Sequence, residues 1–415
     1  MMRNVIIMNK YKVFRPQYFT KFKCIGGECE DICCKDWNIT IDRKTYKKYV
    51  KHRNTNLRKK LKNNILRNRT SKNDYDYAKF KLVNGKCNFL DKDNLCSIYK
   101  ELGEKNMCHT CKIYPRMYDY VNDVIQESLT LSCVEAAKLV LLNKDLMEFE
   151  ITQDSLPEMK LVKRIRSEDS DKILEKYFTE LREFSIDLIQ NRKFSIEERI
   201  IILGLFFKSI DKNIQEKDSV LELILKYKND IENGYYNDIS EKINLDNMID
   251  IQFSILFSLC NNIIPDINTL NERYKKNIFD MIEGLELNLN EIEKSKIKYI
   301  STYKGLYKDF IEDKEYVYEN YLVNYIFTNL FPYNKDDDII YSYMNLVVNF
   351  ILIKFNVIGL CAYYAEEMDL NHLVCLIQNY TKSLLHDVSI DYRIQEYLKS
   401  TNQNTINHMI LMIGK

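Results

Sequence analysis

The chain has 415 residues, of which 46% are hydrophobic and 29% are charged. This balance excludes an intrinsically disordered chain and is typical of a globular protein. Because this length exceeds what one hydrophobic core usually supports, two domains are expected. The net charge of +1 hides an asymmetry: residues 1–140 hold 29 Lys and Arg against 15 Asp and Glu, so this part carries +14 and the remainder carries −13.

The N-terminal stretch does not resemble an export signal. Its apolar run, residues 5–8, is shorter than the hydrophobic region of a secretory signal. The sequence therefore predicts a protein of the reducing cytoplasm.

The first cysteine cluster occupies residues 24–37 and contains Cys24, Cys29, Cys33 and Cys34. Gly26 and Gly27 allow the backbone to fold tightly, as closely spaced metal ligands require. Because adjacent side chains point in different directions, only one of Cys33 and Cys34 is expected to bind any given metal.

A basic stretch follows, since residues 43–73 contain thirteen Lys or Arg and no acidic residue. Such a stretch can attract an anionic partner, or it can be a solvated helical face. Nucleic acid is not expected as the partner, because only Tyr46 and Tyr49 are interleaved with the cations.

The second cluster contains Cys87, Cys96, Cys108, Cys111 and Cys133. Cys108 and Cys111 share the two-residue gap that is common in thiolate metal sites, and His109 between them could complete a zinc site. The candidate metal ligands are therefore the nine clustered cysteines: Cys24, Cys29, Cys33, Cys34, Cys87, Cys96, Cys108, Cys111 and Cys133.

Three interpretations of these cysteines compete: a metal or iron–sulfur site, a disulfide scaffold, and free buried thiols. Disulfides fit poorly with a long chain that has no secretory signal and an odd number of clustered cysteines. Both a four-thiolate iron–sulfur cluster and a structural zinc fit a metal site, and counting ligands does not separate them.

The second half of the chain carries helical signals. A polar stretch at residues 143–157, which ends at Pro157, predicts a boundary between a cysteine-rich metal- or cluster-binding domain (1–145) and a mostly helical domain (146–415). Ser195 and Glu198 form a capping box before an apolar helix. Ten glycines are few for a β-rich protein, so the predicted fold is mainly α, with an irregular cysteine-rich N-terminal region.

One segment, residues 344–365, has the length of a membrane span. Asn345, Asn349, Lys354 and Asn356 interrupt it, and each would be costly in hydrocarbon. We therefore expect a buried core helix and no membrane.

Together these blocks resemble the flagellin lysine-N-methylase family. The resemblance rests on the first cysteine cluster with Trp37 and on six further blocks: Ile39-Thr40-Ile41-Asp42 with Tyr46, Gly85-Lys86-Cys87-Asn88-Phe89-Leu90, Leu95-Cys96-Ser97-Ile98, Leu102-Gly103-Glu104, Thr110-Cys111 with Tyr114-Pro115-Arg116, and Ser132-Cys133-Val134-Glu135-Ala136-Ala137. A weaker similarity covers Glu319-Asn320-Tyr321-Leu322-Val323-Asn324-Tyr325 and Phe331-Pro332.

The resemblance implies transfer of methyl groups from S-adenosylmethionine to lysines of flagellin, with the cysteines holding a centre like a four-iron four-sulfur cluster, or zinc. Within the blocks, the candidate cofactor-binding residues are Trp37, Tyr114 and Arg116, and no catalytic residue is assigned. Aromatic faces, also those of Tyr99 and Tyr118, could stabilise the sulfonium cation or could be core packing.

No known motif locates the cofactor pocket, because the chain has no Gly-x-Gly turn and no Cys-x3-Cys-x2-Cys triplet. The alternative function is a non-enzymatic zinc- or iron-chelating or electron-transfer protein.

Overall fold

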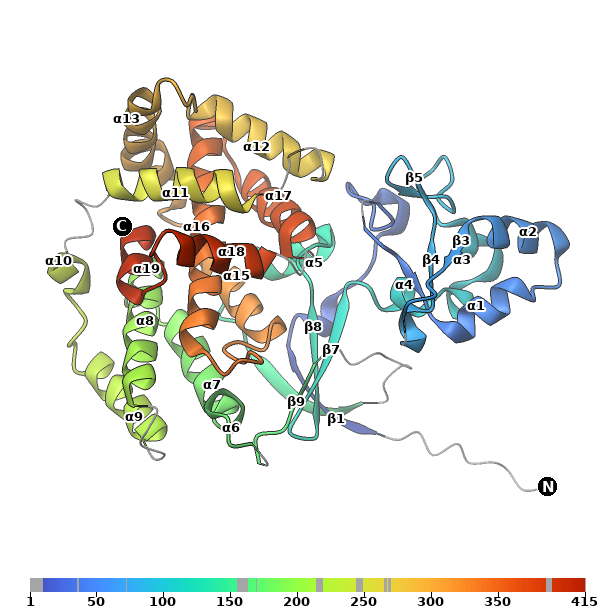
Figure 1. Cartoon of the computed structure of the whole chain (residues 1–415), viewed down its shortest axis with the longest axis horizontal. Coiled ribbons are helices and arrows are strands. Elements are labelled where there is room, and N and C mark those ends of the chain that lie inside the picture. The colour runs from blue at the N-terminus through green and yellow to red at the C-terminus, as the bar shows by residue number, and fades with distance from the viewer. Residues whose placement is uncertain are drawn as a thin grey trace. The chain divides into compact units, whose positions relative to one another are not determined.

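The computed structural model describes residues 10–35, 37–71, 73–154, 163–168, 170–213, 219–243, 249–264, 267, 270–385 and 390–414. The apolar run at residues 5–8 and Pro157 lie outside these ranges. The chain divides into two units (Figure 1): the first comprises Met1–Ala136 and Phe149–Arg164, and the second Ala137–Glu148 and Ile165–Lys415. The boundary predicted at residue 145 lies where the chain passes between the units, and it stays a prediction.

The first unit contains a five-stranded sheet in the order β10-β7-β8-β1-β9. Its strands are β1 (Tyr11–Pro16), β7 (Arg116–Val121), β8 (Val124–Leu129), β9 (Phe149–Asp154) and β10 (Arg164–Ile165). β1 pairs in parallel with β8 and antiparallel with β9. The β7–β8 hairpin turns at Asn122 and Asp123, whose φ angles of 47° and 62° are those of a type I′ turn.

The cysteine-bearing part of this unit is built from short elements. Its strands are β2 (Thr40–Ile41), β3 (Ile65–Arg67), β4 (Ala78–Phe80), β5 (Leu82–Val83) and β6 (Lys86–Cys87), and its helices are α1 (Arg43–Val50), α2 (Thr55–Asn63), α3 (Ser97–Leu102) and α4 (His109–Ile113). β2, β4 and β3 form a three-stranded sheet, and β5 pairs with β6. The region expected to be irregular thus contains regular sheets.

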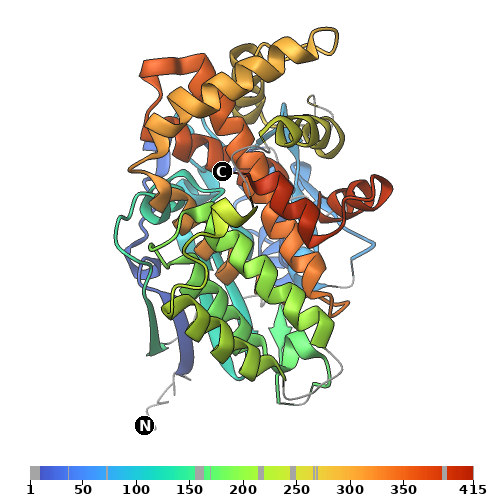
Figure 2. The ribbon, with the colours of Figure 1, turned by 90° about the vertical axis from the view of Figure 1, so that its left-hand side faces the viewer.

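The second unit is built mainly of helices (Figure 2). α5 (Val134–Leu141) leads into it. The further helices are α6 (Ile173–Lys176), α7 (Phe178–Ile189), α8 (Ile196–Asn213), α9 (Ser219–Glu232), α10 (Ile239–Ile243), α11 (Ile249–Ile263), α12 (Glu272–Gly284), α13 (Ile292–Thr302), α14 (Lys308–Ile311), α15 (Glu315–Thr328), α16 (Ile339–Tyr364), α17 (Leu370–Tyr380), α18 (Ile390–Ser400) and α19 (Ile406–Ile413). The prediction of a mainly α protein is confirmed.

The predicted core helix is α16, which packs against α8, α11, α12, α13, α15, α17, α18 and α19. By length and composition this helix could cross a membrane, but 89% of its most apolar window is buried inside the protein. It approaches α12 closely, since a Cβ atom on Gly284 would lie 2.4 Å from the carbonyl oxygen of Gly359. The prediction of a buried core helix is confirmed.

The capping box predicted at the start of α8 is also present. The backbone N–H of Ser195 donates to the Glu198 carboxylate (2.8 Å), and the N–H of Glu198 donates to Ser195 Oγ (3.4 Å). Ile200, Ile201 and Phe206 of this helix are fully buried. The capping box and the apolar pattern therefore predicted the start and the buried face of α8 correctly.

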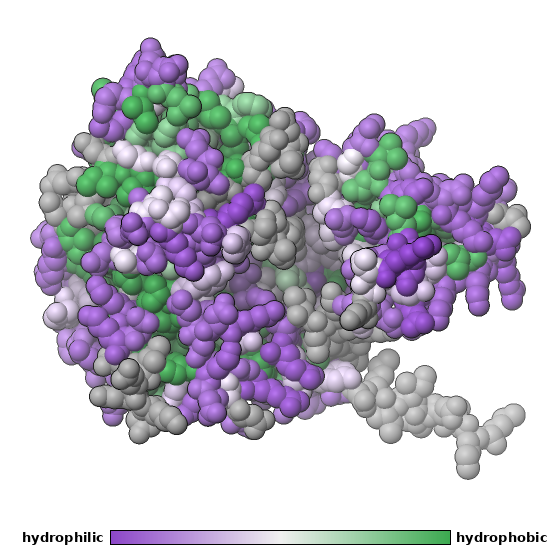
Figure 3. All heavy atoms as spheres, in the orientation of Figure 1, coloured by the Kyte–Doolittle hydropathy of each residue, from purple (hydrophilic) through white to green (hydrophobic). Residues whose placement is uncertain are grey.

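The basic stretch, residues 43–73, begins with α1 and α2 and continues through β3. Figure 3 shows hydrophilic side chains gathered over these two helices. Arg43, Lys44, Lys47, Lys48 and Lys51 are all exposed. Each helix buries only a narrow apolar stripe, represented by Tyr49 in α1 and by Leu57 and Leu61 in α2.

Candidate metal centre

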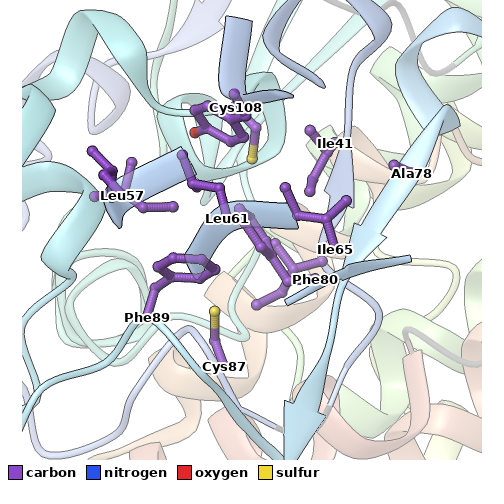
Figure 4. Packing of buried hydrophobic residues seen from close by; sticks show 12 residues of the cluster. Ile41, Leu57, Leu61, Ile65, Ala78, Phe80, Cys87, Phe89 and Cys108 are labelled. Carbon is purple, nitrogen blue, oxygen red and sulfur yellow. The ribbon is translucent and has the colours of Figure 1, made fainter. Parts of the chain in front are cut away.

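Five cysteines meet in one small core. Figure 4 shows Cys87 and Cys108 among apolar side chains of β2, β3, β4 and α2, with both sulfur atoms pointing toward the cluster. Cys34, Cys96 and Cys111 pack against the same cluster. We call Cys34, Cys87, Cys96, Cys108 and Cys111 the first thiol set.

Short elements position this set. Cys87 ends β6, and its backbone N–H donates to the carbonyl of Cys34 (2.9 Å), which aligns the first cysteine cluster with the second. Cys96 and Cys108 are the N-cap residues of α3 and α4, and Cys111 lies within α4. The N-cap position suits a thiolate, because the free N–H groups of the first turn favour negative charge.

Burial and mutual proximity disfavour ionisation of these thiols. Burial raises the pKa of Cys87 to about 11 and also raises that of Cys96. A hydrogen bond with Cys33, followed by burial, raises the pKa of Cys34, and a hydrogen bond with Cys108, followed by burial, raises that of Cys111. Cys34, Cys87, Cys96 and Cys111 therefore favour the neutral thiol unless a cation compensates the negative charge, which is what a thiolate-bound metal does.

Cys29, Cys33 and Cys133 form a second thiol set. Cys133 directly precedes α5, and burial raises its pKa to about 12 in spite of the N–H groups of Ala136 and Glu135, while Cys29 and Cys33 raise it further. Burial also raises the pKa of Cys29. Cys33 borders both sets, since its Sγ lies 3.9 Å from that of Cys34.

Cys24 belongs to neither set. Its side chain is exposed, and its Sγ accepts a hydrogen bond from the N–H of Gly26 (3.4 Å). None of the twelve cysteines, all of which lie in described ranges, forms a disulfide bond. No group of three or more Cys, His, Asp or Glu side chains in the described residues is already arranged as a metal site, so the ligand set stays a prediction.

The predicted cofactor residues are only partly brought together. The rings of Trp37 and Tyr114 lie 5.8 Å apart at 31°. Trp37 Nε1 donates to the carbonyl of Cys33 (2.7 Å), and the Tyr114 hydroxyl lies 3.0 Å from Ser132 Oγ. Burial, followed by the charge of Cys133, raises the pKa of Tyr114. This aromatic pair therefore adjoins the second thiol set.

Arg116 lies two residues beyond Tyr114 in β7, with its guanidinium 5.1 Å from the ring centre of Phe22. Of the other aromatic residues, Tyr118 is buried and Tyr99 is 53% exposed. The aromatic residues of the cysteine blocks therefore do not form one shared cage.

Asp42 joins the basic helix to the cysteine helix, a role that sequence reasoning missed. Its carboxylate accepts hydrogen bonds from the N–H of Thr45 at the start of α1 (2.8 Å) and from the N–H of His109 at the start of α4 (2.9 Å). Burial opposes ionisation of Asp42, but these hydrogen bonds lower its pKa below the ordinary value. The His109 ring, a candidate zinc ligand, lies against Tyr75 (4.8 Å between ring centres).

Two hollows open beside α1. A shallow one of about 820 Å³ is lined by Lys47, Lys48, Lys51, His52, Arg53, Asn54 and Asn106. A second, of about 300 Å³, is lined by Asp42, Arg43, Lys44, Thr45, Lys48, Asp74, Tyr75, His109 and Lys112. Lys48 lines both hollows, so the two adjoin, but only the smaller one has acidic lining residues, Asp42 and Asp74.

In the helical unit, Glu319 of α15 is the anchor of a buried ion-pair network. Its carboxylate lies 2.7 Å from the buried Arg199 and 2.8 Å from Arg192, which is partly exposed. The neighbouring Asn320 donates to the carbonyls of Asn143 (2.7 Å) and Leu141 (3.4 Å). Glu319 and Asn320, which belong to the segment of weaker family similarity, therefore connect parts of the helical unit that are distant in sequence.

Comparison with known proteins adds independent information. The family described as "FliB lysine N-methylase C-terminal domain" matches residues 182–412, more than half of the chain. A flagellar biosynthetic protein, FliU of Salmonella muenchen, is 32% identical over 179 residues, which is 43% of this chain and 98% of the relative.

Two curated proteins named lysine-N-methylase, from Salmonella typhimurium and Salmonella choleraesuis, are each 34% identical over 140 residues. Each match covers 34% of this chain and 35% of the relative, so the chain spans about a third of the length of these two enzymes. No solved structure matches the chain.

A cysteine-bearing unit followed by a helical unit with these matches defines the class as protein-lysine N-methyltransferases. The chain belongs to the FliB lysine N-methylase family. The family prediction, which rested chiefly on the cysteine blocks, is thereby confirmed through the helical unit as well.

Proposed function

We propose that this protein transfers methyl groups from S-adenosylmethionine to lysine ε-amines of flagellin in the cytoplasm, before flagellin is exported. The observation that carries the proposal is the family match over the helical unit in a chain that also presents the cysteine core. The flagellar name of one relative supports a flagellar substrate.

The reaction places simple demands on the site. The lysine ε-ammonium must first lose a proton, because only the neutral amine has a free electron pair. The nitrogen then bonds to the methyl carbon while the carbon–sulfur bond breaks, and the electron pair of that bond stays on sulfur. The site must therefore hold a sulfonium cation and align it with the amine.

Trp37, Tyr114 and Arg116 are the residues that we propose for cofactor binding. The paired rings of Trp37 and Tyr114 offer aromatic faces to a sulfonium cation. Arg116 offers a guanidinium to the carboxylate of the methionine part. Replacing Trp37 or Arg116 by Ala should weaken S-adenosylmethionine binding about tenfold or more in calorimetry. Unchanged binding in both variants would show that the pocket lies elsewhere.

The first thiol set is the proposed holder of the metal centre. Five buried or partly buried thiols in one small core fit a four-thiolate iron–sulfur cluster or a zinc ion, and the pKa of four of them (Cys34, Cys87, Cys96 and Cys111) is raised. When bound, such a centre supplies positive charge that keeps its ligands as thiolates and ties β6, α3 and α4 together. Anaerobic purification followed by metal and sulfide analysis distinguishes the two, and iron with sulfide is the expected result.

Mass spectrometry of flagellin tests the activity. Flagellin from cells that contain the protein should carry added methyl masses on lysine, and flagellin from cells without it should not. If both flagellins are identical, and the purified holoprotein transfers no methyl group to flagellin, the methylase proposal fails. A non-enzymatic metal-binding protein, the function that the shared thiol core favours next, would then take its place.

A further inference from the structure

Four cationic side chains on the later part of α1 and just beyond its C-terminal end lack counter-charges in the part of the chain that the structure describes. Lys47, Lys48, Lys51 and Arg53, here called the cationic face, are exposed and line the larger hollow. Among the described residues, none of the four forms an ion pair. Since the hollow has no acidic lining residue, its positive potential is not neutralised from within the protein.

This arrangement works against the stability of the helix. Lys44 and Lys48 are four residues apart, as are Lys47 and Lys51, and like charges at this spacing repel each other on a helix. The helix dipole compensates partly for Lys47 and Lys48, which lie in the last turn. An anionic partner would compensate all of them.

We propose that the cationic face docks an acidic segment of the protein substrate, a proposal that rests on the proposed lysine methylation. The target lysine itself cannot be what this face attracts, because an ε-ammonium is repelled by four like charges. The face therefore binds a different, acidic part of the substrate, and it raises the local concentration of a substrate whose target lysine enters elsewhere.

Two further observations favour a polypeptide. The larger hollow is lined by no Phe, Tyr or Trp side chain, and its one aromatic ring is the imidazole of His52, so it offers little surface on which successive bases of a single-stranded nucleic acid could stack. In addition, Asp42 fixes the start of α1 to the start of α4, and the hydroxyls of Thr40 and Thr110 lie 2.8 Å apart. A segment docked on α1 is thus held at a fixed position relative to Cys111, within α4.

The test compares two charge-reversed holoproteins. Lys47→Glu/Lys51→Glu/Arg53→Glu reverses the cationic face. Lys226→Glu/Lys304→Glu/Lys399→Glu makes the same change of charge at exposed lysines of the helical unit. A third variant with Gln at positions 47, 51 and 53 removes charge without reversing it. Trp37 fluorescence checks that the first unit of each variant is folded, and far-ultraviolet circular dichroism checks the helical unit.

The probe is a fluorescein-labelled oligoglutamate peptide, whose binding is measured by anisotropy at low and at physiological salt. The face variant should bind about tenfold more weakly than wild type, the Gln variant should be intermediate, and the control should match wild type. Added salt should weaken binding by wild type and by the control. Where flagellin is methylated, the face variant should raise KM and leave kcat unchanged.

Peptide binding needs no methyl transfer, so this result separates the docking proposal from the proposed activity. Weaker binding by the face variant alone supports docking, even if flagellin proves not to be methylated. Equal binding by the face variant and the control overturns it. Binding of labelled single-stranded RNA or of anionic phosphatidylserine vesicles, without binding of the peptide, also overturns it.

Discussion

The cores of the two units differ in size and in the residues that form them. The helical unit surrounds α16 with long apolar side chains from many helices. The cysteine-bearing part of the first unit has a core cluster of only twelve buried residues, two of them cysteines, with three more cysteines packed against it. A core this small supplies little hydrophobic stabilisation, so what the thiols bind should decide whether this part folds. The helical unit should fold without a bound metal.

Removing the proposed metal should give the largest effect. Cys87→Ser or Cys111→Ser, or a strong chelator, should unfold the cysteine-bearing part, because binding free energies of about 10–16 kcal/mol in structural thiolate sites are also folding free energy. The single tryptophan, Trp37, lies in the first unit, so its fluorescence reports this loss. Far-ultraviolet circular dichroism should show that the helical unit keeps its helices.

Cys260→Ala is the matched control, since Cys260 is buried in α11 of the helical unit. It should leave metal content and Trp37 fluorescence unchanged. Full metal content in the Cys87 and Cys111 variants would contradict the contrast between the units and the choice of ligands.

Breaking the Glu319 network should come next in size. Glu319→Ala leaves the Arg199 guanidinium buried without its carboxylate, and losing one partner of a buried pair costs about 3–5 kcal/mol. Urea unfolding followed by circular dichroism measures this loss. Arg192→Ala should cost much less, because the Arg192 side chain is 42% exposed and water replaces it. Equal losses in the two variants would show that burial does not control this network.

Asp42→Asn should have a moderate effect, confined to the first unit. The variant weakens hydrogen bonds to two helix starts and should cost about 1–2 kcal/mol, measured by unfolding monitored through Trp37. Because the folded state lowers the pKa of Asp42, its stabilisation is present above the unfolded pKa and is lost as pH falls through the folded pKa. The difference between wild type and variant should be full well above the unfolded pKa of about 4 and should vanish once the pH falls below the lowered folded pKa. A difference that does not change with pH would contradict an ionised Asp42.

Ser195→Ala should have the smallest effect. It removes one half of the capping box of α8 and should cost about 1 kcal/mol. Thermal unfolding followed by circular dichroism should show a lower midpoint for the helical unit, with no change in Trp37 fluorescence at room temperature. A loss as large as that of Glu319→Ala would mean that the cap acts on more than its own helix.

The amino-acid sequence by itself determined the features that depend on neighbouring residues. The capping box at Ser195 and Glu198, the core helix α16 and the helical character of the second unit all follow from local patterns, and all are present. The cysteine blocks also carried the resemblance to the family. The nine ligands, the metal and the cofactor residues remain predictions.

Only the tertiary structure decided how these parts meet. It divided the thiols into two sets. It also brought Asp42 to His109, 67 positions away in the sequence, and Glu319 to Arg199, 120 positions away. The small sheets of the cysteine-bearing part escaped prediction because their strands β2 and β6 have only two residues, too few to show an alternation. Local sequence periodicity does not predict such long-range contacts. These contacts depend on which residues the folded chain buries and on the need of buried polar groups to find a partner.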